Sequence, residues 1–136
     1  MRPVNDPQEL FERAANGERR ALSRLVSLVE NGGDPAREAL SLVWPHTGGA
    51  RILGITGPPG SGKSTLTNAL VKHLRLQGHT VGVIAVDPSS PFTGGAILGD
   101  RIRMSSHALD SGVYIRSMGT RGQLGGLSAA CTGAAR

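Results

Sequence analysis

One glycine-rich stretch, GPPGSGKS at residues 57–64, limits what this chain can fold into more than any other part of the sequence. It fits the phosphate-binding template G-x-x-x-x-G-K-S/T, which links a strand to the start of a helix. Glycines let the backbone approach a phosphate group closely, and the amides at a helix N-terminus point toward the anion. We therefore expect a nucleoside triphosphate to bind here. The expected contacts are Gly57, Pro58, Pro59, Gly60, Ser61, Gly62, Lys63, Ser64 and Thr65.

The last three of these residues have distinct expected roles. Lys63 would reach the β- and γ-phosphates, which makes it the candidate catalytic residue. Ser64 is placed to give its hydroxyl to Mg²⁺, whereas Thr65 lies one residue further along and is expected at the α-phosphate. The alternative is a glycine-rich turn that fits the template by chance. A strand before the loop and a helix after it would favour the phosphate-binding loop over that alternative.

Those segments predict an α/β fold of the P-loop NTPase type, with a mostly parallel sheet. Residues 51–56 form an apolar run that we interpret as a buried strand, and an amphipathic helix is expected from the loop to Gly78. Two further strands are predicted at residues 80–86 and 112–118, so the sheet has about three strands. Such a strand-loop-helix-strand unit places ligands at the carboxyl ends of its parallel strands.

Two carboxylates are candidates for the Mg²⁺ site. Asp87 follows the second predicted strand at its carboxyl end, and Asp100 comes after an irregular twelve-residue segment. Segments of this kind sense the γ-phosphate and the metal in phosphoryl-transfer enzymes. The alternative for Asp87 is a turn residue before Pro88, and the alternative for Asp100 is the N-cap of a helix over residues 101–109.

The first 49 residues predict a small helical segment that precedes the nucleotide domain. Asp6 and Asp34 each precede a proline, a pattern typical of a helix N-cap with proline at the first helical position. The expected helices cover residues 7–16, 18–30 and 35–43. We therefore divide the chain into a helical extension, residues 1–49, and a partial nucleotide domain, residues 50–136.

The charge, cysteine content and hydropathy of the sequence argue against several other classes of protein. Residues 50–136 carry nine Lys or Arg and three acids, but these cations form no run and aromatic residues make up only 3% of the chain, so polyphosphate is a simpler partner than nucleic acid. The single cysteine, Cys131, excludes an intramolecular disulfide. No apolar stretch is long enough for a membrane span, and residues 1–20 are too charged for a signal peptide, so we expect a cytoplasmic protein with no membrane partner.

Four stretches of the sequence carry a resemblance to a known family. GITGPPGSGKSTL, VIAVDPSSPFTGGAILGDRIRM and IRSMGTRGQLGGLS, in this order and spacing, resemble the methylmalonyl-CoA mutase-associated GTPases of the MeaB/ArgK group. The N-terminal GERRALSRLVSLVE is similar to the helical extension of that family. The resemblance covers residues 1 to about 128, and residues 129–136 do not look like the family.

The resemblance implies a GTPase that acts as a chaperone for an adenosylcobalamin-dependent acyl-CoA mutase, loading and protecting its cofactor. It implies GTP and Mg²⁺ as ligands, with Lys63 on the phosphates and Ser64, Asp87 and Asp100 around the metal. It also implies a family homodimer. Arg101 and Arg103 are candidates for stabilising phosphate charge, with a surface role as the alternative.

The sequence departs from the family in its second half. It contains no N-K-x-D signature for guanine, and family members continue for roughly two hundred further residues. We therefore expect a fragment or truncated form. Two other functions stay open: a nucleotide-binding module without turnover, and an ATP-dependent kinase of a lysine, arginine and ornithine transport system.

Overall fold

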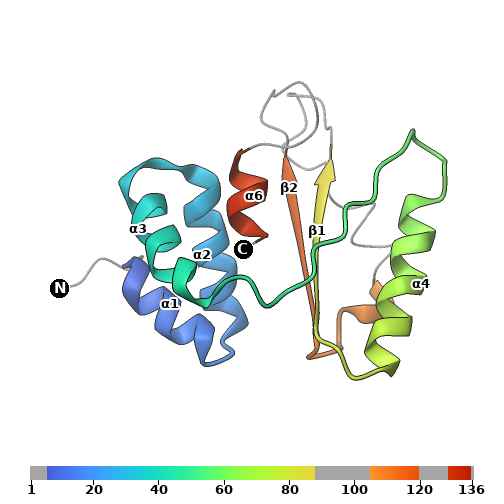
Figure 1. The fold of residues 1–136 in the computed structure, drawn as a ribbon, viewed down its shortest axis with the longest axis horizontal. Coiled ribbons are helices and arrows are strands. Elements are labelled where there is room, and N and C mark those ends of the chain that lie inside the picture. The colour runs from blue at the N-terminus through green and yellow to red at the C-terminus, as the bar shows by residue number, and fades with distance from the viewer. Residues whose placement is uncertain (1–5, 88–104, 120–128, 136) are drawn as a thin grey trace. The chain divides into compact units, whose positions relative to one another are not determined.

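In a computed structural model of the chain, the structure describes residues 6–87, 105–119 and 129–135. These residues form an α/β protein with helices and a small parallel sheet (Figure 1). Its elements are α1 (Pro7–Ala15), α2 (Arg19–Asn31), α3 (Gly33–Val43), η1 (Trp44–His46), α4 (Lys63–Leu76), β1 (Val81–Asp87), η2 (Ser105–His107), β2 (Val113–Gly119) and α6 (Ala129–Ala134).

The chain divides into two compact units. The first unit comprises Met1–Ile52 together with Leu127–Arg136, and the second comprises Leu53–Gly126. Among the described elements, the first unit holds α1, α2, α3, η1 and α6, and the second holds the sheet with α4 and η2.

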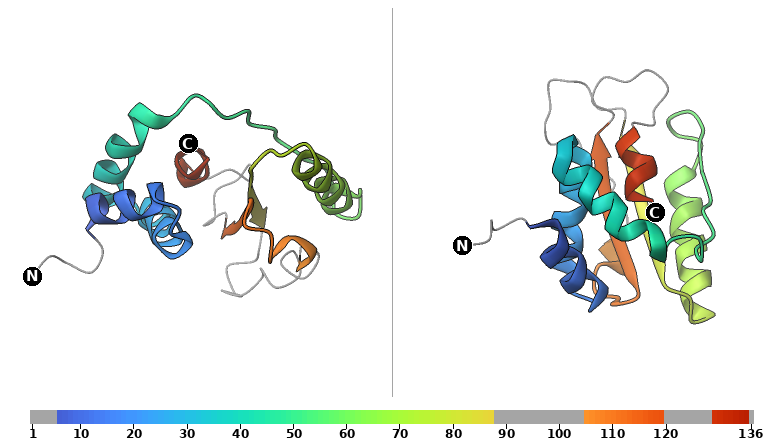
Figure 2. Two further views of the ribbon diagram at one scale, coloured as in Figure 1. Left: turned by 90° about the horizontal axis from the view of Figure 1, so that it is seen from below. Right: turned by 60° about the vertical axis from the view of Figure 1, so that its left-hand side comes forward.

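The three helices predicted near the N-terminus are confirmed, with small shifts at their ends (Figure 2). Asp6 caps α1, because its Oδ1 accepts a hydrogen bond from the Gln8 backbone amide at 3.1 Å. The second Asp-Pro pair differs. Helix α3 begins at Gly33, so Asp34 lies in its first turn, where its carboxylate pairs with Arg37 at 3.3 Å. The prediction that Asp34 is the N-cap is therefore wrong.

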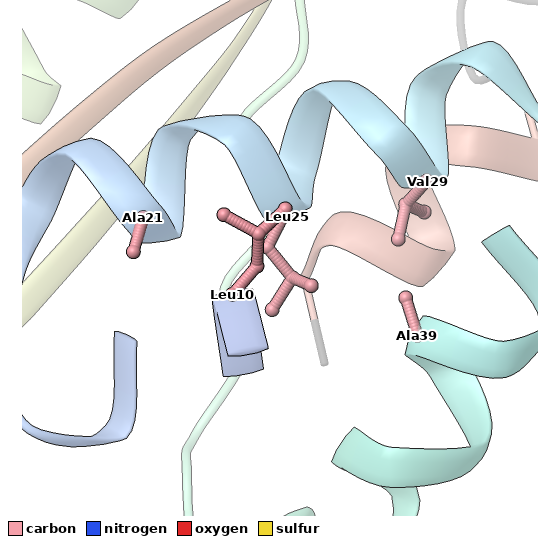
Figure 3. Close-up of a cluster of buried hydrophobic side chains, with 5 residues drawn as sticks. All are labelled: Leu10, Ala21, Leu25, Val29 and Ala39. Carbon is pink, nitrogen blue, oxygen red and sulfur yellow. The ribbon is translucent and has the colours of Figure 1, made fainter. Parts of the chain in front are cut away.

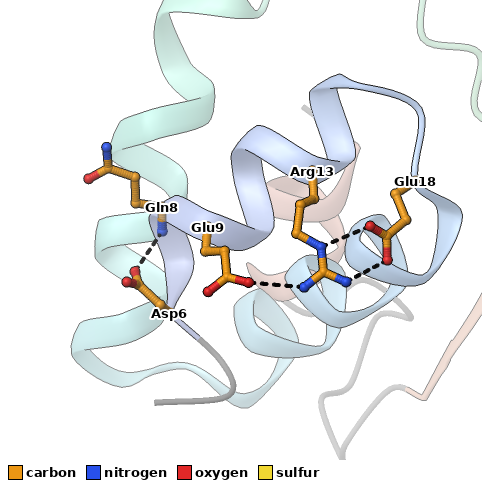
Figure 4. A network of polar contacts seen from close by, with 5 residues as sticks. All are labelled: Asp6, Gln8, Glu9, Arg13 and Glu18. Atoms are coloured by element: carbon orange, nitrogen blue, oxygen red, sulfur yellow. Dashed lines mark hydrogen bonds and ion pairs between the residues drawn. The ribbon is translucent and has the colours of Figure 1, made fainter. Parts of the chain in front are cut away.

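Arg13 joins the end of α1 to the start of α2 (Figure 4). Its Nε and Nη2 donate to the two carboxylate oxygens of Glu18 at 2.8 and 2.7 Å, and its Nη1 donates to Glu9 at 3.1 Å. The hydrogen bonds from Arg13 lower the pKa of the Glu18 carboxyl, and those to Glu18 and Glu9 raise the pKa of Arg13. One guanidinium thus fixes the turn between two helices.

The core of the first unit lies where α1, α2 and α3 meet (Figure 3). The apolar positions of α2 recur every four residues, which places them on one face of the helix. The buried residues of the core cluster are Leu10 from α1, Ala21, Leu25 and Val29 from α2, and Ala39 from α3. This face of α2 is therefore used for packing within the first unit.

Helix α6 packs on the same unit, against α2. A Cβ atom on Gly133 would lie 2.9 Å from Val29 Cγ1 and 3.3 Å from Leu40 Cδ2, so the backbone of α6 comes very close to α2 and α3. Cys131 is 4% exposed. Six residues are too few for a stable isolated helix, so this packing is what supports α6.

The second unit contains two of the three predicted strands. β1 and β2 are parallel and pair from Val81 with Val113 to Asp87 with Gly119. Helix α4, predicted from the loop to Gly78, is confirmed, and it contacts β1. Its C-terminal turn leads through Gly78 directly into β1, so the helix and the strand run in opposite directions (Figure 1).

The strand predicted at residues 51–56 is not formed. Ile52 and Leu53 are 73% and 68% exposed, and the segment pairs with neither β1 nor β2. A strand exists only where a neighbouring strand satisfies its backbone donors and acceptors. The prediction of a buried third strand is therefore wrong for the described residues, and the described sheet has two strands.

Candidate phosphate-binding site

The glycine-rich loop turns directly into α4. Gly60 and Gly62 have φ values of 78° and 89°, in the left-handed region that suits glycine. The Ser61 amide donates to the Pro58 carbonyl at 3.3 Å and closes a turn inside the loop. The Leu66 amide then donates to the Gly62 carbonyl at 2.9 Å as the first bond of the helix. Both glycines are therefore required by the backbone path that the structure shows.

The start of α4 differs from the start of α1. No side chain caps α4 and no acidic residue lies in its first turn, whereas α1 is capped by Asp6. The first amides of a helix lack partners within the helix and carry its positive dipole end. An anion such as phosphate can supply both the missing acceptor and the compensating charge.

Lys63 lies at the first position of α4 and folds back over the loop. Its Nζ donates to the Pro58 carbonyl at 2.9 Å. The side chain is half-buried, while residues 57–62 are exposed. A single ammonium group is thus held over an exposed glycine-rich loop, which suits the binding of a polyphosphate.

Gly57 closes the other side of the loop. A Cβ atom at this position would lie 2.9 Å from Ser61 Oγ, so the start of the loop lies close to Ser61. Ser64 is half-buried and Thr65 is exposed, both in the first turn of α4. The nine predicted phosphate contacts, residues 57–65, therefore form one continuous loop and helix start.

Only some of the predicted metal ligands lie among the described residues. Asp87 is the last residue of β1, and because β1 runs opposite to α4, this strand end lies at the same end of the unit as the glycine-rich loop (Figure 1). Asp100, Arg101 and Arg103 lie outside the described residues, as does the loop that follows Gly119. Within the described residues, no group of three or more His, Cys, Asp or Glu side chains could hold a metal ion.

The residue types at positions 64 and 87 fit Mg²⁺ in kind. Mg²⁺ prefers oxygen ligands and in nucleotide sites takes one or two carboxylates together with phosphate oxygens and water. A serine hydroxyl at the start of α4 and a carboxylate residue at the end of β1 supply this chemistry.

The second unit contains a polar cluster that the sequence analysis did not predict. Arg75 in α4 forms a two-pronged ion pair with Asp110, with both N–O distances 2.9 Å. The partners are 35 residues apart, and no short motif links positions at that separation. This cluster lies at the opposite end of α4 from the glycine-rich loop.

The chain matches the model of one protein family. That family is described as "Methylmalonyl Co-A mutase-associated GTPase MeaB", and the match covers residues 22–135. The match corrects the sequence prediction that residues 129–136 depart from the family, because it includes all of α6.

Individual relatives agree with this match. The "Putative GTPase" of Pyrococcus abyssi is 62% identical over 122 residues, 90% of this chain and 38% of the relative. GTPase ArgK of Escherichia coli is 44% identical over 125 residues, 88% of this chain and 38% of the relative. A Streptomyces virginiae protein named for its place in the mutB 3' region is 48% identical over 93 residues, 65% of this chain and all of the relative.

The chain spans about two fifths of the length of these two GTPases. Within the described ranges, no helix has the length and apolar character of a membrane span.

Proposed function

This chain belongs to the methylmalonyl-CoA mutase-associated GTPase family, and we propose that it carries the nucleotide-binding loop of a GTPase that serves an adenosylcobalamin-dependent methylmalonyl-CoA-type mutase as a chaperone. The observation that carries the proposal is the start of α4. A family-matched glycine-rich loop, an uncapped helix N-terminus and the folded-back Lys63 coincide there.

In this proposal the loop binds the triphosphate of GTP. Backbone amides of residues 60–65 contact the phosphates, and Lys63 exchanges the Pro58 carbonyl for β- and γ-phosphate oxygens. The exchange replaces a neutral acceptor with a charged one, which makes a stronger hydrogen bond. Lys63 thereby offsets the phosphate charge that develops during transfer.

Mg²⁺ is the proposed metal. It would neutralise the phosphate oxygens when bound, with Ser64, Asp87 and Asp100 as the ligands from the protein. The donor chemistry of Ser64 and Asp87 at one end of the second unit supports this part of the proposal.

The mutase is the proposed protein partner. The family is named for its association with methylmalonyl-CoA mutase, and one relative is named for the mutB 3' region. Cofactor loading, protection of the mutase and a homodimer belong to the proposal for the whole protein. So do the cytoplasmic location and the division into a helical extension, residues 1–49, and a partial GTPase domain, residues 50–136.

A titration with GTP and ATP, each with and without Mg²⁺, tests the proposal if affinity and phosphate release are followed together. Binding of GTP that strengthens with Mg²⁺ would support it, and phosphate release would show that the chain turns GTP over. Mg²⁺-dependent binding without release would favour the nucleotide-binding module instead. Absence of triphosphate binding would contradict the proposed function.

A further inference from the structure

Arg75 connects three parts of the second unit. Its Nε and Nη2 donate to Asp110 Oδ2 and Oδ1 at 2.9 Å each, and its Nη1 donates to the His79 carbonyl at 2.6 Å. Arg75 lies in the last turn of α4, His79 in the turn before β1, and Asp110 in the turn before β2. One planar guanidinium therefore connects the C-terminal end of α4 to the turns that precede β1 and β2.

The contacts continue into the sheet. Asp110 Oδ1 also accepts from the Gly112 amide at 2.8 Å, and the Gly112 carbonyl accepts from the Val81 amide at 2.9 Å. A Cβ atom on Gly112 would overlap the Arg75 guanidinium, so a side chain at this position would require the guanidinium to shift. We call Arg75, His79, Asp110 and Gly112 the amino-end clamp, because they lie at the amino ends of β1 and β2.

Partial burial strengthens the clamp. The side chains of Arg75 and Asp110 are 24% and 32% exposed, less than those of the Arg37–Asp34 pair at 81% and 91%. Two-pronged pairs with limited exposure hold their geometry better than single surface contacts. The clamp is thus a fixed point from which both strands start.

A fixed starting point sets the register of the whole strand pair. Val81 faces Val113 at the clamped end, so Asp87 faces Gly119 six residues later. A shift by one residue would turn every side chain of a strand to the other face. The clamp also holds the end of α4, whose other end carries Lys63 and Ser64.

We propose that Arg75 is a positioning residue for Mg²⁺-dependent nucleotide binding: through the amino-end clamp it fixes the register of β1 and β2 and so places Asp87 relative to the first turn of α4. This inference rests on the proposed function, because it takes Asp87 as a Mg²⁺ ligand. Arg75 touches no nucleotide in this account and acts only through the two strands and the helix that it joins.

The test is a comparison of nucleotide affinity with and without Mg²⁺. Arg75→Lys keeps the charge but loses the two-pronged geometry, and Asp110→Asn keeps the shape but loses the charge. Lys72→Ala is the matched control, because it removes an exposed cation from the same helix outside the clamp. Affinity for a fluorescent GTP analogue is measured in Mg²⁺ and in EDTA, with circular dichroism to follow folding.

We expect both clamp variants to remain folded and to lose most of the affinity gained from Mg²⁺, at least several-fold, while affinity in EDTA stays close to that of the unmodified chain. Lys72→Ala should leave both affinities unchanged. A purely structural clamp would weaken both affinities equally or unfold the chain, and either result would overturn the inference. So would a folded clamp variant with the full gain from Mg²⁺.

The unmodified chain separates this inference from the proposed function. If it shows no triphosphate affinity, or none that Mg²⁺ strengthens, the proposed site itself fails and the positioning role fails with it. If it shows the gain and the clamp variants keep it, only the positioning role fails.

Discussion

Lys63 is the residue on which the proposed phosphate contacts depend most. Its ammonium group is already held over the loop by the Pro58 carbonyl at 2.9 Å, so little reorganisation is needed when phosphate replaces that carbonyl. A charge-assisted hydrogen bond contributes about 1.5–3 kcal/mol, which corresponds to about 10- to 100-fold in affinity. We therefore expect Lys63→Ala to weaken GTP binding by about that factor, as measured by titration calorimetry.

The control is Lys72→Ala, which removes the same charge from α4 away from the loop. It should leave the affinity unchanged. Equal losses in the two variants would mean that GTP is attracted by the overall positive charge of α4, and the assignment of the phosphate loop would then be rejected.

At the scale of single elements, the two Asp-Pro pairs of the first unit provide a direct comparison. Asp6 accepts a hydrogen bond from the Gln8 amide, whereas Asp34 lies inside the first turn of α3 and makes an exposed ion pair with Arg37. Loss of an N-cap costs about 1 kcal/mol, and an exposed pair contributes less. We expect Asp6→Ala to lower the free energy of unfolding by about 1 kcal/mol.

Asp34→Ala should lower the free energy of unfolding by less than about 0.5 kcal/mol. Urea unfolding followed by Trp44 fluorescence would measure both, since Trp44 directly follows α3 in the first unit. If the order of the two effects were reversed, the cap would belong to α3 and the sequence prediction for Asp34 would be restored.

Helix α6 offers a second prediction at this scale. Ala favours a helix over Gly by about 1 kcal/mol, so Gly133→Ala should strengthen α6 if propensity alone decided. The added Cβ would instead lie 2.9 Å from Val29 Cγ1. We expect the helix to loosen from α2, and the buried Cys131 thiol to react faster with a thiol reagent.

Thr132→Ala is the matched control for α6, because Thr132 is exposed and its substitution changes only helix propensity. The Cys131 thiol should then react at the same rate or more slowly. A slower reaction in Gly133→Ala would show that α6 tolerates a side chain at this position and that its close packing is not required.

The elements that the sequence predicts well are those with local causes. The N-terminal helices follow from apolar spacing, from the Asp6 cap of α1 and from Gly32 at the end of α2, all within a few residues of each helix. The loop and α4 follow from one continuous motif. Residues 51–56 have the apolar character of a strand, but a strand also needs a partner, and the sequence of the segment says nothing about whether one is available. The Arg75–Asp110 pair was missed for the same reason, because its partners come together only after the sheet has formed.

At the scale of the whole molecule, one carboxylate in each unit links stability to pH. Hydrogen bonds from Arg13 lower the pKa of Glu18 in the first unit. Hydrogen bonds from Arg75, and then from the Gly112 amide, lower the pKa of Asp110 in the second. A carboxyl whose pKa is lower in the folded state stabilises the fold above its unfolded pKa, and this contribution disappears as the pH falls through the folded pKa. Both units should therefore be fully stable at neutral pH and lose stability below the ordinary carboxyl values, 4.5 for Glu18 and 3.8 for Asp110.

Each unit has its own reporter for this loss of stability. Trp44 fluorescence follows the first unit, and the amide resonance of Tyr114 in β2 follows the second. We expect Glu18→Gln to reduce the dependence of urea unfolding on pH between about 3 and 5 when Trp44 is observed, and Asp110→Asn to reduce it when Tyr114 is observed. In the hydrogen bonds described, the pair Arg13–Glu18 contacts only residues of the first unit. The pair Arg75–Asp110 contacts only residues of the second unit. Each substitution should therefore affect mainly the reporter of its own unit. Equal effects of one substitution on both reporters would show instead that the two units unfold as a single cooperative body.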